Sequence, residues 1–220
     1  MSTATVRDAP VAERLDSLAH VAERLGGIPV DRIVTWPLPG AATDEDLLRE
    51  PRLCELVDGV LVEKPMATFE SLLAVILIRI LGPYLDVHDS GIVLGADGLQ
   101  RLAPGLIRAP DVSFISWNQF PDHELPAEAI FNVYPELAVE ILSPTNTENE
   151  MARKRSEYFA AGARLVWIMN SEAVTVQVWT SPVDCSVHTI DDVLDGGDVL
   201  PGFRVSIRAW IEKAGRRKSR

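Results

Sequence analysis

The chain has 220 residues, of which 47% are hydrophobic, so it can bury a full core and is not intrinsically disordered. Its 21 basic and 32 acidic residues give a net charge of −11, which excludes nucleic-acid binding through the overall electrostatic field. Two widely separated cysteines, Cys54 and Cys185, fit a reducing compartment, and the N-terminus lacks the apolar core of a signal peptide. We therefore expect a cytoplasmic protein with no membrane partner.

The N-terminal segment predicts two helices. The apolar positions of the first follow the spacing of one helix face: Val11, Leu15, Leu18, Ala22 and Leu25. This helix is expected to end at Gly26 and Gly27 and to pack on the domain or on a second subunit. Thr43 with Asp46 predicts the start of a second, short helix.

The next segments predict a hairpin, a buried helix and three strands. Two apolar stretches within 53–64 flank Asp58-Gly59, a pair typical of a tight hairpin turn. Thr68 is expected to cap a buried helix that continues to about Tyr84. Glycine and proline residues then separate strands predicted at 91–95, 99–102 and 106–116.

The second half of the chain predicts strands on both sides of one helix. A short strand is expected within 135–144, and Thr147 with Glu150 resembles a capping box before a helix that ends at Gly162. Segments 164–170 and 174–180 predict a hairpin, followed by a last strand and a helix near Ala209. This order of elements predicts an α/β fold (mixed α+β) with a central mixed sheet flanked by helices.

Two carboxylates interrupt apolar strands. Asp111 follows Pro110 at the front of one strand, and Glu140 lies inside another. The neighbours of Glu140 on both faces are apolar: Ala138, Val139, Ile141 and Leu142. Such a charge costs free energy unless it is paired or binds a cation, so a central strand with a functional carboxylate is one interpretation. An exposed edge strand is the other.

Lys154 is a third candidate. The chain has four lysines and 17 arginines, yet position 154, between Arg153 and Arg155, is a lysine. Lysine can give up its proton and arginine cannot, and helical spacing places Tyr158 where it could orient the amine. Taken alone, a lysine at this position is predicted to be an exposed surface residue. Together with two carboxylates on neighbouring strands, it suits a Mg²⁺ site that acts on a phosphate.

Four ordered blocks carry a resemblance to a known family: CELVDGVLVEK, RAPDVSFIS, PELAVEILSP and RKRSEYFAAGARLVWIMN. The chain resembles, over about 53–178, the Uma family of "putative restriction endonucleases", part of the PD-(D/E)xK nuclease superfamily. The resemblance implies a restriction-endonuclease-like core at 51–212, a helical N-terminal extension at 1–50 and a basic tail at 213–220.

The resemblance also implies roles for individual residues. Asp111 and Glu140 match the metal ligands of the superfamily, with the main-chain carbonyl of Ile141 as a possible third ligand. Glu55 matches an upstream glutamate that can hold a metal-bound water. Many members carry a histidine at the start of the buried helix, where this chain has Phe69 and Glu70.

The lysine of the superfamily motif does not stand in its usual place. Two residues after the second acid this chain has Leu142. In this family the lysine lies on the following helix, which matches Lys154, four residues before Tyr158.

We therefore expect an endonuclease that uses Mg²⁺ or Mn²⁺ to hydrolyse DNA phosphodiester bonds, in restriction or in a mobile element. The expected partner is double-stranded DNA, contacted by Arg153 and Arg155, and the expected assembly is a homodimer. One alternative is a catalytically silent nuclease fold that binds DNA or a partner protein. Another is an oligomeric scaffold whose N-terminal helix is the dimer contact.

Overall fold

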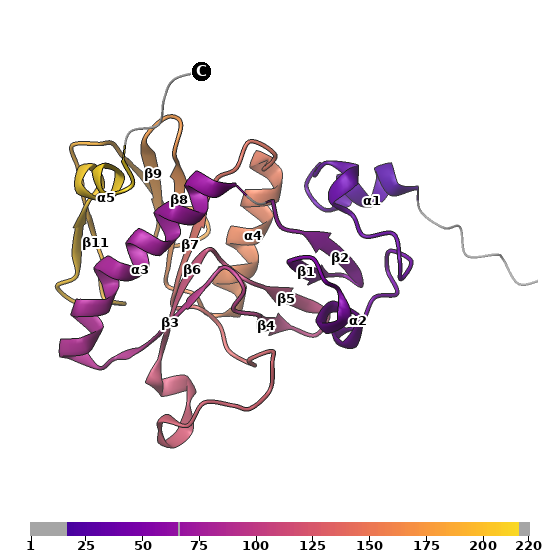
Figure 1. Cartoon of the computed structure of the whole chain (residues 1–220), viewed down its shortest axis with the longest axis horizontal. Coiled ribbons are helices and arrows are strands. Elements are labelled where there is room, and N and C mark those ends of the chain that lie inside the picture. Colours follow the sequence, from indigo (N-terminus) through magenta and orange to yellow (C-terminus); the bar gives the residue numbers. More distant parts are fainter. Residues whose placement is uncertain (1–16, 66, 216–220) are drawn as a thin grey trace, which may run out of the picture.

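The computed structural model describes residues 17–65 and 67–215 and shows an α/β fold built on two main sheets (Figure 1). The larger, six-stranded sheet has the order β10-β9-β8-β7-β6-β3. Its strands are β3 (Gly91–Gly95), β6 (Val112–Ser116), β7 (Leu137–Ile141), β8 (Leu165–Asn170), β9 (Thr175–Trp179) and β10 (Cys185–His188). Strands β7 and β8 are parallel and the other neighbours antiparallel, so the sheet is mixed, as predicted.

The four-stranded sheet has the order β2-β1-β5-β4. Its strands are β1 (Cys54–Val57), β2 (Val60–Glu63), β4 (Gln100–Ala103) and β5 (Leu106–Arg108). Strands β1 and β2 form the predicted hairpin. Asp58 and Gly59 have φ angles of 52° and 72°, as a two-residue turn of this kind requires.

The N-terminal part packs on this smaller sheet. It contains α1 (Leu18–Arg24), a 3₁₀ turn (Val30–Arg32) and α2 (Asp44–Arg49). Helix α1 buries Val21 and Ala22 against Val57 and Val60 of the hairpin. The predicted Val11 and Leu15 lie outside the described residues. Helix α2 begins with the predicted capping box, in which Thr43 and Asp46 bond each other's backbone.

Three further helices cover the larger sheet: α3 (Thr68–His88), α4 (Glu148–Ala161) and α5 (Ile207–Lys213). Helices α3 and α5 pack on one face, and α4 packs on the other face and also contacts β4 (Figure 1). Leu137, Val139 and Ile141 of β7 face α3, whereas Ala138 packs with α4. Because side chains alternate along a strand, Glu140 points to the α4 side.

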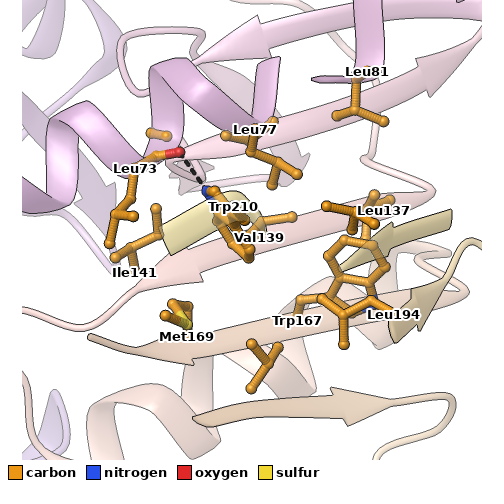
Figure 2. Close-up of a cluster of buried hydrophobic side chains, with 14 of the residues drawn as sticks. Leu73, Leu77, Leu81, Leu137, Val139, Ile141, Trp167, Met169, Leu194 and Trp210 are labelled. Carbon is orange, nitrogen blue, oxygen red and sulfur yellow. Dashed lines mark hydrogen bonds between the residues drawn. The ribbon is translucent and has the colours of Figure 1, made fainter. Parts of the chain in front are cut away.

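The main core lies between α3, α5 and the sheet (Figure 2). Leu73, Leu77 and Leu81 repeat every fourth residue along α3 and are all 0% exposed. Trp210 of α5 is also fully buried, and its indole Nε1 donates a hydrogen bond to the carbonyl of Leu73 at 2.9 Å (Figure 2). This bond ties the last helix of the described chain to α3.

Trp210→Phe should lower the free energy of unfolding by about 1–3 kcal/mol, because it removes a buried hydrogen bond and part of a packed ring. Urea denaturation followed by circular dichroism measures the change. The control is Trp36→Phe, since Trp36 is 80% exposed and the same substitution there should have little effect. Equal effects of the two substitutions would contradict this view of the core.

Helix α3 is long and apolar enough to cross a membrane, by length and composition only. Its buried leucines pack on the strands of the larger sheet (Figure 2). In this fold α3 therefore serves as the core helix.

The structure corrects two local predictions. Segment 106–116 is not one strand, because β5 ends at Arg108 and joins the smaller sheet, whereas β6 begins at Val112 and joins the larger one. Pro110 interrupts the strand because it has no N–H to donate. Thr68 does not cap α3: Ala67 is the N-cap, makes no side-chain cap bond, and the helix continues past Tyr84 to His88.

The helix and hairpin predicted in the second half are confirmed, because α4 ends at Gly162 and β8 pairs antiparallel with β9. Thr147 caps α4 by accepting a hydrogen bond from the Glu150 N–H. The Glu150 carboxylate binds Arg32 and Asn146 instead of completing a capping box. The remaining elements are 3₁₀ turns (Trp117–Gln119, Pro121–His123) and a two-stranded sheet of β11 (Val193–Asp195) and β12 (Arg204–Ser206).

Candidate active site

Asp111 lies directly before β6, and Glu140 lies on the neighbouring strand β7. Strands β6 and β7 are antiparallel with Val112 paired to Val139, and this register, extended one residue beyond the start of β6, would set Asp111 opposite Glu140. Glu140 points to the α4 side, whereas Asp111 lines a cavity together with Ile141 and residues at the start of α3. The Ile141 N–H donates to Asp111 Oδ2 at 2.8 Å and holds this carboxylate at the strand end. The split between β5 and β6 therefore places Asp111 near enough to Glu140 for its charge to act on that carboxyl.

Helix α4 brings two polar side chains to Glu140. Lys154 Nζ lies 3.2 Å from Glu140 Oε1, and the Tyr158 hydroxyl donates to the same oxygen at 2.5 Å. All three side chains are buried, with Glu140 4% exposed on a central strand. Among the described hydrogen bonds, those to Glu140 end on Oε1, which leaves Oε2 for another partner.

Glu55 reaches the same place from β1 of the smaller sheet. Its carboxylate is 0% exposed and lies 3.2 Å from Lys154 Nζ, so the lysine bridges Glu55 and Glu140. Arg108 of β5 pairs with Glu55 at 2.7 Å and with Glu157 at 2.6 Å, and the Ala109 N–H donates to Glu55 at 3.1 Å. The cluster thus joins the two sheets and α4.

Burial and charge act in opposite directions on the pKa values of this cluster. Burial raises the pKa of Glu55, but Lys154 and Arg108 outweigh burial and hold this pKa well below its usual value. Burial lowers the pKa of Lys154, but the carboxylates of Glu140 and Glu55 raise it above its usual range. Lys154 is therefore a charged ammonium at neutral pH.

The pKa of Glu140 is shifted in the opposite direction from that of Glu55. Burial raises the pKa of its carboxyl, and the charge of Asp111 adds to this effect while Lys154 opposes it. Burial also raises the pKa of Tyr158 well above its usual value, so this hydroxyl remains a proton donor to Glu140. A further cation next to Glu140 would stabilise the charged form of this carboxyl.

A cavity of about 590 Å³ opens next to the cluster. Asp111, Ile141 and Lys64 are part of its lining, whereas Glu55, Glu140 and Lys154 lie deeper in the protein. Lys64 follows β2 and its Nζ lies 3.1 Å from Asp111 Oδ1. Of the three acids of the cluster, Asp111 is therefore the one that a solute in the cavity meets first.

These donors fit a small divalent cation. Within residues 17–65 and 67–215, no group of three or more His, Cys, Asp and Glu side chains is placed to hold a metal. Mg²⁺ is typically bound by one or two carboxylates and keeps several waters, and Asp111 and Glu140 supply two such carboxylates. The ammonium of Lys64 already stands beside Asp111 as a cation. A main-chain carbonyl and water would complete the shell.

The structure places the two predicted DNA contacts elsewhere on α4. Arg153 pairs with Asp58 and Glu157 at 2.7 Å each, next to the hairpin of the smaller sheet. The guanidinium of Arg155 stacks 3.5 Å from the ring centre of Trp179 on β9. Each arginine thus has partners in its own chain, on a different side of the helix from Lys154.

Lys64 and Arg108 are the site residues that the sequence analysis missed. Arg108 carries the same signal that drew attention to Asp111, a charge in an otherwise apolar strand. Lys64 is one of only four lysines and directly follows an apolar strand. Neither pattern shows which acid each cation meets, because Asp111 and Glu55 belong to other strands.

Comparisons with known proteins add two findings. The model of the Uma2 family, described as "Putative restriction endonuclease", matches residues 44–208. The fold is similar to a crystal structure of "a putative nuclease belonging to DUF820 from Anabaena variabilis ATCC 29413", with a TM-score of 0.67 and 17% identity. That match covers 77% of this chain and 97% of the other and shows a shared fold. Comparison with curated proteins gives no match.

Proposed function

The chain belongs to the Uma2 family of "Putative restriction endonuclease" proteins, and we propose that it is a metal-dependent endonuclease that hydrolyses DNA phosphodiester bonds. The observation that carries the proposal is the opposed pair Asp111 and Glu140, with the charged Lys154 bound to Glu140. Two like charges opposite each other destabilise a sheet unless a cation offsets them. Here Lys64 offsets Asp111 and Lys154 offsets Glu140, and such a cluster of mutually perturbing charges beside a cavity is typical of a functional site.

The carboxylates of Asp111 and Glu140 would hold Mg²⁺ or Mn²⁺, with the carbonyl of Ile141 as the main-chain ligand. Ile141 supports this role because it lines the cavity beside Asp111 and its N–H orients the Asp111 carboxylate. When bound, the metal would supply Lewis acidity that offsets the negative charge of the phosphate and makes water a better nucleophile.

Side chains of the protein orient the proposed metal ligand Glu140 and stabilise negative charge on the phosphate. Tyr158 and Lys154 fix one oxygen of Glu140 and so orient the carboxylate. Because the carboxylates of Glu140 and Glu55 raise the pKa of Lys154, we assign its ammonium electrostatic stabilisation of the charge that builds on the phosphate. Glu55 holds Lys154 from the other side, and Arg108 holds Glu55.

The proposed substrate is double-stranded DNA, bound by a homodimer, because cutting both strands is easiest with two sites. We propose that residues 51–212 form the catalytic domain, and the family match at 44–208, which covers most of this range, supports the proposal. Arg153 and Arg155 are proposed to contact DNA at the edge of the site. To do so, they would exchange partners in their own chain for phosphate groups.

The experiment is incubation of the protein with supercoiled plasmid and labelled oligonucleotides in Mg²⁺, Mn²⁺ or chelator. We expect nicked and linear products with metal and none with chelator. Cleavage that persists in chelator would contradict the proposal. Stable DNA binding without cleavage under any metal condition would favour the catalytically silent alternative instead.

A further inference from the structure

Lys64 has an unusual environment for a lysine. It is 4% exposed, and its ammonium donates to three oxygens: Asp111 Oδ1 at 3.1 Å, the Ala96 carbonyl at 3.3 Å and the Ala109 carbonyl. One carboxylate and two main-chain carbonyls resemble the oxygen shell of a metal ion. The three N–H groups of the ammonium thus match three acceptors.

The cluster already balances its charges without a metal. It contains three carboxylates and three cations, a formal sum of zero: Asp111, Glu140, Glu55, Lys64, Lys154 and Arg108. Glu157, the second partner of Arg108, is balanced by its own pair with Arg153. A divalent cation at Asp111 and Glu140 would leave two uncompensated positive charges in a largely buried site. Such an excess costs free energy unless one of the resident cations moves away.

Lys64 is the cation that can move. Lys154 is held between Glu55 and Glu140, and Arg108 between Glu55 and Glu157. Of the three cations, Lys64 alone lines the cavity among the described residues. The same lining includes the carboxylates of Glu70 and Asp97, which can receive a displaced ammonium.

We propose that Lys64 is a resident cation of the site, which neutralises Asp111 until a divalent ion displaces its ammonium into the cavity. Lys64 then lowers the affinity of the site for metal. When no metal is bound, its ammonium offsets the negative charge of Asp111 and Glu140. Lys64 can take this role only if the proposed metal site exists, so the experiment separates the two.

The first measurement is calorimetric titration of Mn²⁺ alone into the chelator-treated parent, Lys64→Met and Lys213→Met. Methionine keeps a long apolar side chain but removes the competing charge. In the parent, Mn²⁺ must break the hydrogen bond between the Lys64 ammonium and Asp111 before it binds. Lys64→Met has no such bond and should therefore bind Mn²⁺ about tenfold more tightly or better. Lys213, exposed on α5, is the matched control and should leave the parent affinity unchanged.

The second measurement uses the parent protein and does not depend on the stability of a variant. Acetylation of lysines with and without saturating Mn²⁺, read by mass spectrometry, reports which ammonium groups become accessible. Labelling of Lys64 should rise several-fold with Mn²⁺. Lys154 should remain protected and Lys213 should be labelled in both states.

The outcomes distinguish the two ideas. Equal or weaker Mn²⁺ binding by Lys64→Met than by the parent overturns the role of Lys64 and leaves the metal site standing. Labelling of Lys64 that stays constant while Mn²⁺ binds overturns it as well. No Mn²⁺ binding by the parent or by Lys64→Met overturns both the metal site and the role of Lys64.

Discussion

Glu140→Gln and Lys154→Met should each lower the rate of metal-dependent DNA cleavage by at least about a thousandfold. Glutamine keeps the shape of Glu140 and removes the charge that would bind the metal. Methionine at 154 removes the ammonium that orients Glu140 and offsets charge on the phosphate. Initial rates of plasmid nicking, with protein folding checked by circular dichroism, measure both effects.

Two substitutions of the same chemistry serve as controls. Glu136→Gln changes a buried glutamate just before the other end of β7, where the carboxylate accepts hydrogen bonds from Ser116. Lys213→Met changes an exposed lysine on α5. Both controls should cleave at nearly the parent rate. Folded Glu140→Gln and Lys154→Met proteins that also cleave at the parent rate would show that the site lies elsewhere.

Arg108→Met should lower the free energy of unfolding by about 3–5 kcal/mol, because it removes one of the two cations that bind the buried Glu55 and one of the two that bind Glu157. Arg108 is 4% exposed, so water cannot replace the lost partner. Urea denaturation followed by tryptophan fluorescence gives the change.

Arg208→Met is the matched control for Arg108→Met. Arg208 pairs with Asp191 on the surface, where both side chains are at least half exposed. Removal of this pair should leave the free energy of unfolding nearly unchanged, since water and salt screen surface ion pairs. Equal losses in the two variants would show that the buried network does not stabilise the fold.

The sequence alone was enough to predict elements that depend on local chemistry. The Asp58-Gly59 turn, the Thr43 capping box and the end of α4 at Gly162 are correct because each rests on neighbouring residues. The apolar pattern around Glu140 also correctly indicated a central buried strand. These features required no knowledge of distant contacts.

Contacts between distant segments could not be predicted from these patterns. Lys64 and Asp111 are 47 residues apart, and Arg108 and Glu55 are 53 apart. Each pair forms only because β1, β2 and β5 make a second sheet beside the larger one. The apolar residues on both sides of Pro110 made 106–116 resemble one strand and hid the break at which the chain passes between the sheets.

The net charge of −11 belongs to the whole chain and differs from the charge of the candidate active site. In the candidate active site, three acids meet three cations, so the site is formally neutral despite the acidic chain. An added divalent ion would make this region positive, which is the sign that a phosphate requires. The overall charge therefore does not decide whether DNA is bound locally.

Diffraction from crystals soaked in Mn²⁺, recorded near the manganese absorption edge, tests the central claim that Asp111 and Glu140 hold the catalytic metal. The account predicts an anomalous peak about 2–2.5 Å from one oxygen of each carboxylate. It also predicts that the peak is lost in Asp111→Asn. A peak that lies only elsewhere, or no peak in crystals that cleave DNA when dissolved with Mn²⁺, would contradict it.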